Sequence, residues 1–82
     1  METHEAALDR ITVDPQVLGG KPCIRGMRIS VEHILDALAA SIKEEEFLKE
    51  YPFLESDDIR AALLYAKELV AAERVYVVGQ QE

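Results

Sequence analysis

The stretch Leu18–Ile29, which reads LGGKPCIRGMRI, differs in composition from the rest of the chain. It holds three of the four glycines of the protein and three basic residues, Lys21, Arg25 and Arg28. Glycine adopts positive φ without steric cost and proline fixes its own backbone angle, so this composition predicts a sharply turning segment. Its apolar residues can be buried, and we therefore expect an ordered connector rather than a flexible linker.

Upstream of the connector, Arg10–Asp14 (RITVD) alternates apolar and polar residues. This alternation predicts a half-buried strand with Ile11 and Val13 on one face. Arg28–Ile29 is expected to form a second short strand that pairs with the first across the connector, which gives an N-terminal β-hairpin. We expect residues 1–9 to be frayed, with at most a helical turn at Glu5–Asp9.

Downstream, two helices are predicted in succession. Ser30 is a favourable N-cap for Val31–Ala40, whose apolar residues recur at the i, i+3, i+4, i+7 spacing of one helix face. Ser41, followed three residues later by Glu44, has the capping-box pattern and predicts a second helix over Ile42–Glu50. Pro52 ends it, because proline cannot continue a helix.

A third helix is predicted from Ser56, as N-cap, to about Glu73. The carboxylates of Asp57 and Asp58 favour the positive end of its dipole. The helical spacing predicts a buried face and a solvent face. The buried face contains Ile59, Ala62, Leu63, Ala66, Leu69 and Val70, and the solvent face contains Arg60, Ala61, Leu64, Lys67 and Glu68.

The tail at residues 74–82 contains the run VYVV. Its β-branched residues favour a strand, and a strand edge without a partner can pair with another chain. Continuation of the third helix explains the run equally well. The candidate partner-binding residues are Val75, Tyr76, Val77 and Val78.

The composition indicates one domain, over residues 10–73, in a chain of 82 residues with net charge −7. A negative surface opposes non-specific nucleic-acid binding. However, residues 10–28 carry four basic residues against one acidic residue. No apolar run has the ~20 residues of a membrane helix, and Met1–Arg10 does not have the pattern of a signal peptide. With its single cysteine, Cys23, the chain is expected to be cytoplasmic and to bind no membrane.

No residue pattern indicates an enzyme, a cofactor or a metal site. The segment GGKP does not have the spacing of a phosphate-binding loop, and His4 and His33 do not have the spacing of metal ligands. Glycine-turn amides beside cations can instead hold phosphate. The candidate DNA-binding residues are Lys21, Arg25, Arg28, Arg60 and Lys67.

Two alternatives compete with DNA binding. Consecutive helices with short loops occur in any small bundle, and the third helix has few basic residues for a recognition helix. The connector cations can also pair with carboxylates of the same chain. Guanidinium groups that such carboxylates hold inward would leave only a partner-binding role.

The segments ITVDPQVLGGKPCIRGMRISVEHILDALAA and FLKEYPFLESDDIRAALLYAKEL resemble a small bacterial and archaeal family catalogued as domain of unknown function 433. The resemblance covers about Arg10 to Leu69, and its most specific part is Val13–Pro15 followed by Leu18–Gly26. It implies a homeodomain-like helix-turn-helix fold with an N-terminal β element. It also implies an antitoxin role, in which members act beside a PIN-like ribonuclease toxin and repress their own operon as dimers.

The expected fold is thus mainly α: a three-helix, homeodomain-like helix-turn-helix bundle with a short N-terminal β-hairpin. The expected function is an antitoxin-type DNA-binding regulator that forms a homodimer, neutralises a toxin and binds operator DNA. The alternative is a protein-interaction module that binds a dimer mate or a basic partner without DNA.

Overall fold

The computed structural model describes the backbone of residues 2–81 and the side chains of residues 2–72. The described backbone is mainly helical, with a small two-stranded antiparallel sheet. In chain order the elements are α1 (His4–Leu8), β1 (Ile11–Thr12), the 3-10 turn η1 (Leu18–Gly20), β2 (Cys23–Ile24), α2 (Val31–Ala39), α3 (Glu44–Glu50) and α4 (Ser56–Gln81).

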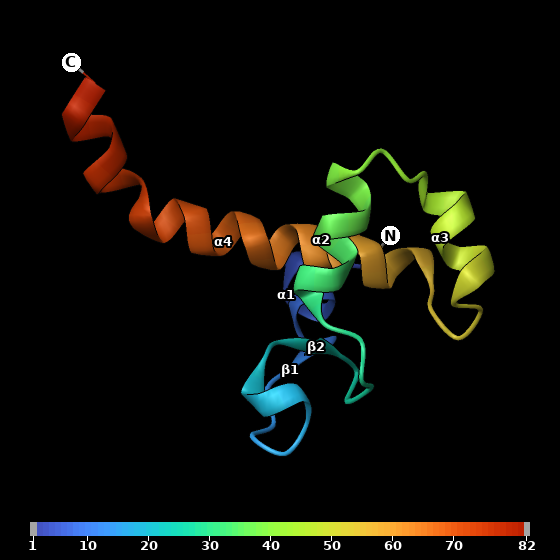
Figure 1. The fold of residues 1–82 in the computed structure, drawn as a ribbon. Helices are drawn as coiled ribbons and strands as arrows, with labels where there is room; N and C mark the ends of the chain where they lie inside the picture. The colour runs from blue at the N-terminus through green and yellow to red at the C-terminus, as the bar shows by residue number, and fades with distance from the viewer. Residues whose placement is uncertain (1, 82) are drawn as a thin grey trace.

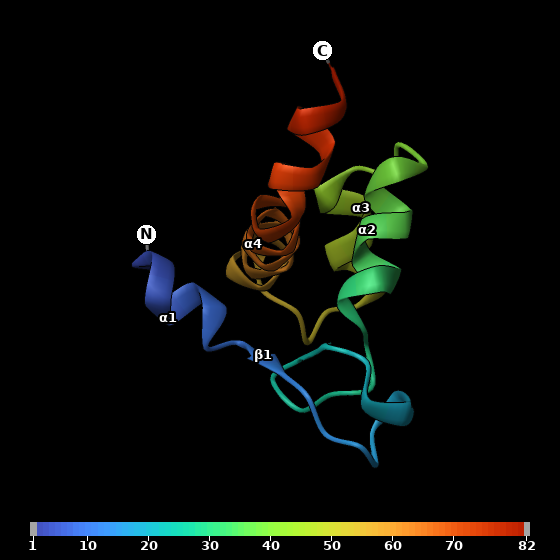
Figure 2. The ribbon, with the colours of Figure 1, turned by 90° about the vertical axis from the view of Figure 1, so that its left-hand side faces the viewer.

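Helix α4 is the element on which the others are assembled. It contacts α1, α2, α3 and β1. Figure 2 shows α1 on one side of α4, α2 and α3 on the other side, and the strands below. The second half of α4 projects away from the other elements (Figure 1). For this reason the radius of gyration, 13.9 Å, exceeds the ~12 Å of a compact chain of this length.

The sheet forms with a different partner strand from the one predicted. β1 pairs with β2, with Ile11 opposite Ile24 and Thr12 opposite Cys23, whereas Arg28–Ile29 was the predicted partner. Arg25 and Gly26 have positive φ angles of 46° and 74°, and the Met27 amide donates to the Ile24 carbonyl at 2.8 Å. These are the features of a type I′ turn, which reverses the chain earlier than expected.

Residues after this turn lie along the other edge of β2. The Ile24 amide donates to the Ile29 carbonyl at 3.1 Å, and Cys23 forms a bridge with Ser30. The predicted strand Arg10–Asp14 is reduced to Ile11–Thr12, and Val13 is 61% exposed rather than buried beside Ile11. The strand prediction was therefore correct in type and wrong in extent and partner.

Helix α2 confirms its prediction closely. The Ser30 hydroxyl accepts a hydrogen bond from the His33 amide at 3.0 Å, as an N-cap does. Val31 and Ile34 are buried in the core, and Leu35 and Leu38 pack against it. The helix ends at Ala39, one residue before the predicted end.

Ser41 ends α2 and does not cap α3, contrary to the prediction. Its φ is +69°, its amide donates to the Leu38 carbonyl at 3.0 Å, and the Ile42 amide donates to the Ala37 carbonyl at 3.0 Å. This pair of bonds is the Schellman motif, in which the residue with positive φ is most often glycine. Helix α3 consequently begins at Glu44, after Lys43.

Ser56 does not cap α4 either. It is the first residue of that helix, and its hydroxyl donates to Glu44 Oε2 at 2.6 Å. Asp58 has the capping role, because its Oδ2 accepts from the Glu55 amide at 2.9 Å. The side chain three residues into a helix thus bonds back to the amide at its entrance.

The predicted faces of α4 are partly wrong. Ile59 and Ala62 are buried as expected, and Ala61, which was assigned to solvent, is also fully buried. The predicted core residues Leu63, Leu69 and Val70 are 48%, 51% and 66% exposed. Elements pack on both sides of α4 near its start, which explains the burial of Ala61. Leu69 and Val70 belong to the second half of α4, which projects away from the other elements (Figure 1).

The N-terminal segment is ordered, contrary to the expectation of fraying. The Thr3 hydroxyl accepts from the Ala6 amide at 3.1 Å, and α1 packs against α4 with Ala7 fully buried. The helical turn expected at Glu5–Asp9 is therefore α1.

Helix α4 also continues to Gln81, past the predicted end at Glu73. The helical alternative for the run at 75–78 is therefore correct and the strand alternative is wrong. None of the helices in the described part of the chain is long and apolar enough to cross a membrane.

Candidate functional site

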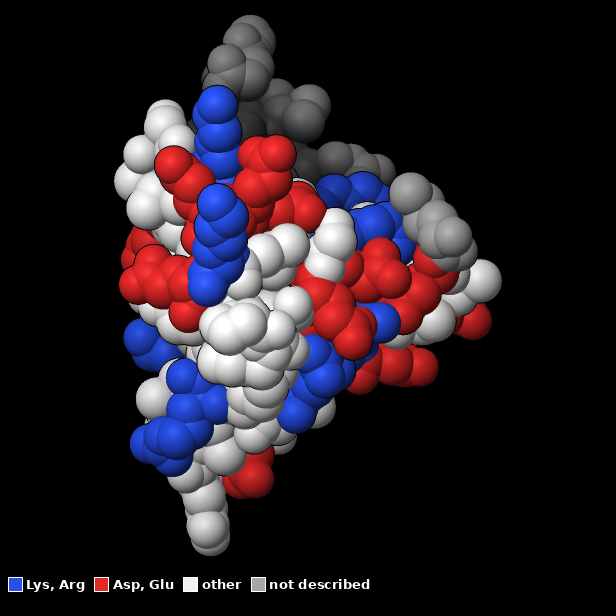
Figure 3. All heavy atoms as spheres, turned by 90° about the vertical axis from the view of Figure 1, so that its right-hand side faces the viewer, with Lys and Arg blue, Asp and Glu red and all other residues white. Residues whose placement is uncertain are grey.

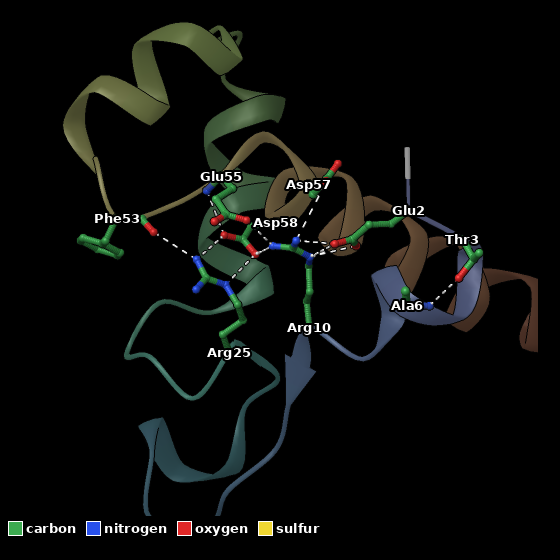
Figure 4. Close-up of polar contacts among 9 residues, drawn as sticks. All are labelled: Glu2, Thr3, Ala6, Arg10, Arg25, Phe53, Glu55, Asp57 and Asp58. Carbon is green, nitrogen blue, oxygen red and sulfur yellow. Dashed lines mark hydrogen bonds and ion pairs between the residues drawn. The ribbon is translucent and has the colours of Figure 1, made fainter.

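The arginine–aspartate cluster, which we define as Arg10, Arg25 and Asp58, joins three parts of the chain (Figure 4). Arg10 precedes β1, Arg25 follows β2, and Asp58 lies in the first turn of α4 with its side chain fully buried. Asp58 Oδ1 accepts from Arg10 Nη1 at 2.8 Å and from Arg25 Nε at 3.0 Å. Its Oδ2 accepts from Arg25 Nη2 at 2.7 Å.

The cluster extends to neighbouring residues. Arg10 also pairs with Glu2 and, at 2.8 Å, with Glu55, while Arg25 Nη2 donates to the Phe53 carbonyl at 3.0 Å. Burial by itself would raise the pKa of Asp58. The hydrogen bonds from Arg25 and Arg10 outweigh burial, so the pKa of Asp58 lies below its ordinary value. The cluster is therefore ionised at neutral pH and holds both guanidinium groups against α4.

Arg25 is held in this cluster and is therefore not one of the outward-facing cations that the prediction of DNA binding requires. Its guanidinium donates to Asp58 and to the Phe53 carbonyl, and its pKa is raised chiefly by the hydrogen bond with Asp58. Most of its hydrogen-bonding capacity is thus used within the chain. In this arrangement Arg25 is a structural tie between the β2 turn and α4.

Two other connector cations remain at the surface. Lys21 Nζ lies 2.9 Å from Glu32 Oε1, and both side chains are more than half exposed. Such exposed pairs contribute ~0–1 kcal/mol, so Lys21 can exchange this partner. Arg28 is exposed and has no ion-pair partner among the side chains at residues 2–72.

The two α4 cations lie elsewhere. Lys67 pairs with Glu68 at 3.4 Å, and Glu68 also contacts His4 of α1 at 3.0 Å. Arg60 has a buried Nη1 atom without a hydrogen-bond partner in the described part of the chain. Lys21 pairs with Glu32 of α2, whereas Lys67 pairs with Glu68, which contacts His4 of α1. Helices α1 and α2 lie on opposite sides of α4 (Figure 2). The contacts of these five candidate DNA-binding residues therefore differ: Lys21, Arg25 and Lys67 pair with carboxylates of three different residues, and Arg60 has a buried guanidinium nitrogen.

Charges alternate over the face that Figure 3 shows, where Lys and Arg side chains lie in separate groups among acidic and uncharged ones. This distribution differs from the continuous basic strip that phosphate binding favours.

An apolar groove between α2 and α4 was not found by sequence reasoning. Its volume is about 320 Å³, and its apolar lining consists of Pro22, Val31, Leu35, Tyr65, Ala66 and Leu69. Glu32 and Asp36 supply the acidic lining. Val31, Leu35, Ala66 and Leu69 were assigned to apolar helix faces, whereas Pro22 and Tyr65 were not assigned to the core. The spacing of apolar residues by itself does not show which of them remain uncovered.

The candidate partner-binding residues Val75, Tyr76, Val77 and Val78 follow the groove along α4. Their backbone is helical, and their side chains lie outside the described residues. Leu69 and Val70, at the limit of the described side chains, are exposed. The groove therefore includes an exposed apolar side chain, Leu69, and the next residue of α4, Val70, is also exposed.

Known proteins resemble this chain in sequence and in fold. The chain is 37% identical over 62 residues to "Uncharacterized protein y4eO" from Sinorhizobium fredii, an alignment that covers 76% of this chain and 28% of that protein. A crystal structure of a DUF433 member protein from Anabaena variabilis ATCC 29413 superposes with a TM-score of 0.71 at 30% identity. That superposition covers 78% of this chain and 63% of the crystallised one.

The chain thus spans less than two thirds of the length of both relatives. Residues 11–66 match the family described as "Protein of unknown function (DUF433)". The matched range contains the sheet, α2, α3 and the first part of α4, which carries Asp58. The agreement of sequence match and fold shows that this chain belongs to the DUF433 family.

Proposed function

We propose that the protein is a non-catalytic protein-interaction module whose groove between α2 and α4 binds an apolar helix of a basic partner protein. The observation that carries the proposal is the apolar lining of the groove, in which Leu69 is 51% exposed. Helix-in-groove binding is a common way in which such a surface is covered.

Charge complementarity supports a basic partner over a second copy. The chain carries a net charge of −7, so two copies repel one another. Glu32 and Asp36 line the groove beside its apolar residues. A partner helix with Lys or Arg next to its apolar face would pair with these carboxylates, and electrostatic attraction would also speed association.

The antitoxin role that the family resemblance implies is one form of this proposal. In that form the basic partner is a small PIN-like toxin, and neutralisation follows from occupation of the groove. We also propose, as part of the same role, that the helices form a homeodomain-like bundle and that the protein is cytoplasmic.

The test is coexpression with the product of the adjacent gene, followed by size-exclusion chromatography with light scattering. Leu69 lines the groove and is 51% exposed, whereas Leu63 on the same helix is 48% exposed and lies outside it. Covering the exposed half of a leucine is worth ~1 kcal/mol, so Leu69→Gln should weaken the complex about five-fold. Leu63→Gln is the matched control and should change affinity less than two-fold.

Equal effects of the two substitutions would overturn the groove as the binding site. If the chain forms a homodimer and Leu69→Gln dissociates it, the occupant of the groove is a second copy and not a basic partner. A complex that forms only when operator DNA is present would also contradict the proposal.

A second candidate is the DNA-binding regulator, and Arg28 is the observation that favours it. Its side chain is exposed, has no described acidic partner and belongs to the same connector as Lys21. Fluorescence anisotropy with DNA upstream of the gene, compared with a scrambled duplex at moderate salt, tests this role. Specific binding that Arg28→Gln reduces supports it, and equal weak binding to both duplexes contradicts it.

A further inference from the structure

A second pocket lies between the connector, the start of α2 and the loop that leads into α4. Its volume is about 370 Å³, and its lining consists of Leu18, Arg28, Ile29, Ser30, His33, Tyr51 and Phe53. It shares no residue with the groove between α2 and α4. Its size is within the range of small-ligand sites.

Aromatic side chains form one wall of this pocket. The ring centroids of Tyr51 and Phe53 are 6.0 Å apart, and His33 Nε2 lies 3.0 Å from the Tyr51 hydroxyl. Tyr51 also packs on buried Phe47 at 4.7 Å. Phe53 is 54% exposed, so one large ring is available to a planar ligand.

The wall is held in place by the arginine–aspartate cluster. Arg25 donates to the Phe53 carbonyl at 3.0 Å while its other contacts bind it to Asp58. The loop that carries Phe53 is therefore tied to the turn after β2. A site with a fixed wall loses less conformational entropy when a ligand binds.

Polar groups in the pocket favour a negative charge. Arg28 has no ion-pair partner among the side chains at residues 2–72, whereas Arg10 and Arg25 are paired with carboxylates. The Ser30 hydroxyl accepts from the His33 amide and retains its own proton as a donor. The two acidic residues that line the groove are not part of this pocket.

We propose that this pocket binds an anion that carries an aromatic ring, with the ring against Phe53 and Tyr51 and the anionic group on Arg28. The anionic group is a phosphate, as in a mononucleotide, or a carboxylate, as in an aromatic amino acid. Charge-assisted bonds from a guanidinium suit both groups, and stacking on an aromatic side chain suits both rings.

The experiment is a titration of the full chain followed by NMR chemical-shift changes. The probes are AMP and N-acetylphenylalanine, and each has a neutral counterpart, adenosine or N-acetylphenylalanine amide. Inorganic phosphate and acetate test the anion without the ring. At least one charged aromatic probe should bind ten-fold more tightly than its neutral counterpart and than the free anion.

Four variants locate the site. Arg28→Gln should weaken binding at least ten-fold, and Phe53→Ala at least three-fold, because each removes one of the two recognised features. Lys49 is exposed and lies outside the pocket, so Lys49→Gln is the charge-matched control and should change affinity less than two-fold. Far-UV circular dichroism verifies that each variant is folded, and Arg28→Lys provides a milder change at the same position.

Preference for AMP over N-acetylphenylalanine would identify the phosphate form of the ligand, and the reverse preference the carboxylate form. Equal binding of charged and neutral probes would overturn the proposal. So would no shift at millimolar probe concentrations, or the same loss of affinity in Lys49→Gln as in Arg28→Gln.

Discussion

Replacement of Asp58 by asparagine is expected to remove a large part of the stability of this protein. The Asp58 side chain is fully buried and accepts four hydrogen bonds, three of them from Arg10 and Arg25. An amide of the same shape has one oxygen acceptor and turns an N–H group toward a guanidinium. The substitution therefore leaves two cations without their buried counter-charge.

The magnitude follows from this geometry. Removing one member of a buried ion pair costs ~3–5 kcal/mol. The Arg10 and Arg25 side chains are 17% and 37% exposed, so water can partly replace the lost carboxylate. We therefore expect a loss of about 3 kcal/mol, against a total of ~4–12 kcal/mol for a domain of this length.

Asp57→Asn is the matched control, because Asp57 is the neighbouring residue on the same helix. Its side chain is 41% exposed and lies 3.9 Å from Arg10, so its removal should cost less than about 1 kcal/mol. The assay is urea unfolding followed by far-UV circular dichroism at pH 7. A loss in Asp58→Asn no larger than that in Asp57→Asn would refute the reasoning.

Two further predictions concern acid and the end of α2. Because the pKa of Asp58 is lowered by folding, its stabilisation is present above the carboxyl pKa of the unfolded chain, ~3.9, and is lost as the pH falls through the folded value. The unfolding free energy of the native chain should fall between pH 5 and pH 2.5, and it should fall less in Asp58→Asn. An equal fall in the two proteins would contradict this prediction. Ser41 has a φ of +69°, so Ser41→Gly should stabilise the fold by about 0.5–1 kcal/mol in urea unfolding, the relief of backbone strain less the greater flexibility of glycine when unfolded. Destabilisation by Ser41→Gly would contradict this account of the turn.

Local features of the fold could be predicted from the sequence. The N-cap at Ser30 and the apolar spacing that follows it are contained within one helix, and α2 formed as predicted. The glycines of the connector likewise predicted positive φ, which Gly19, Gly20 and Gly26 adopt. Each of these predictions depends on residues a few positions apart.

The predictions were wrong for residues that suit two local roles or that contact residues far away in the sequence. Ser41 and Ser56 are both typical N-caps, but Ser41 ends the preceding helix and Ser56 bonds to Glu44. Asp58 appeared to be an ordinary acidic residue of a first helical turn. Its role depends on Arg10, which lies 48 positions away, and no local pattern indicates such a contact.

Large separations in the sequence also explain why the candidate site could not be predicted in full. Arg25 was expected to face a ligand because no local pattern shows that it pairs with Asp58, which lies 33 positions further along the chain. The groove and the aromatic pocket each combine residues from the connector, from α2 and from positions after residue 50. Sequence reasoning identified Arg28 individually, but not the rings of Tyr51 and Phe53 beside it.

The dependence of α1 and β1 on α4 sets an order of events during synthesis. Until the ribosome has released the first turn of α4, Arg10 and Arg25 have no buried carboxylate to receive them, and Ala7 has no helix to cover it. The amino-terminal segment therefore cannot reach its final packing before that point. Closure of the amino-terminal third then becomes one of the last steps in acquiring the native state, as expected when contacts join distant positions.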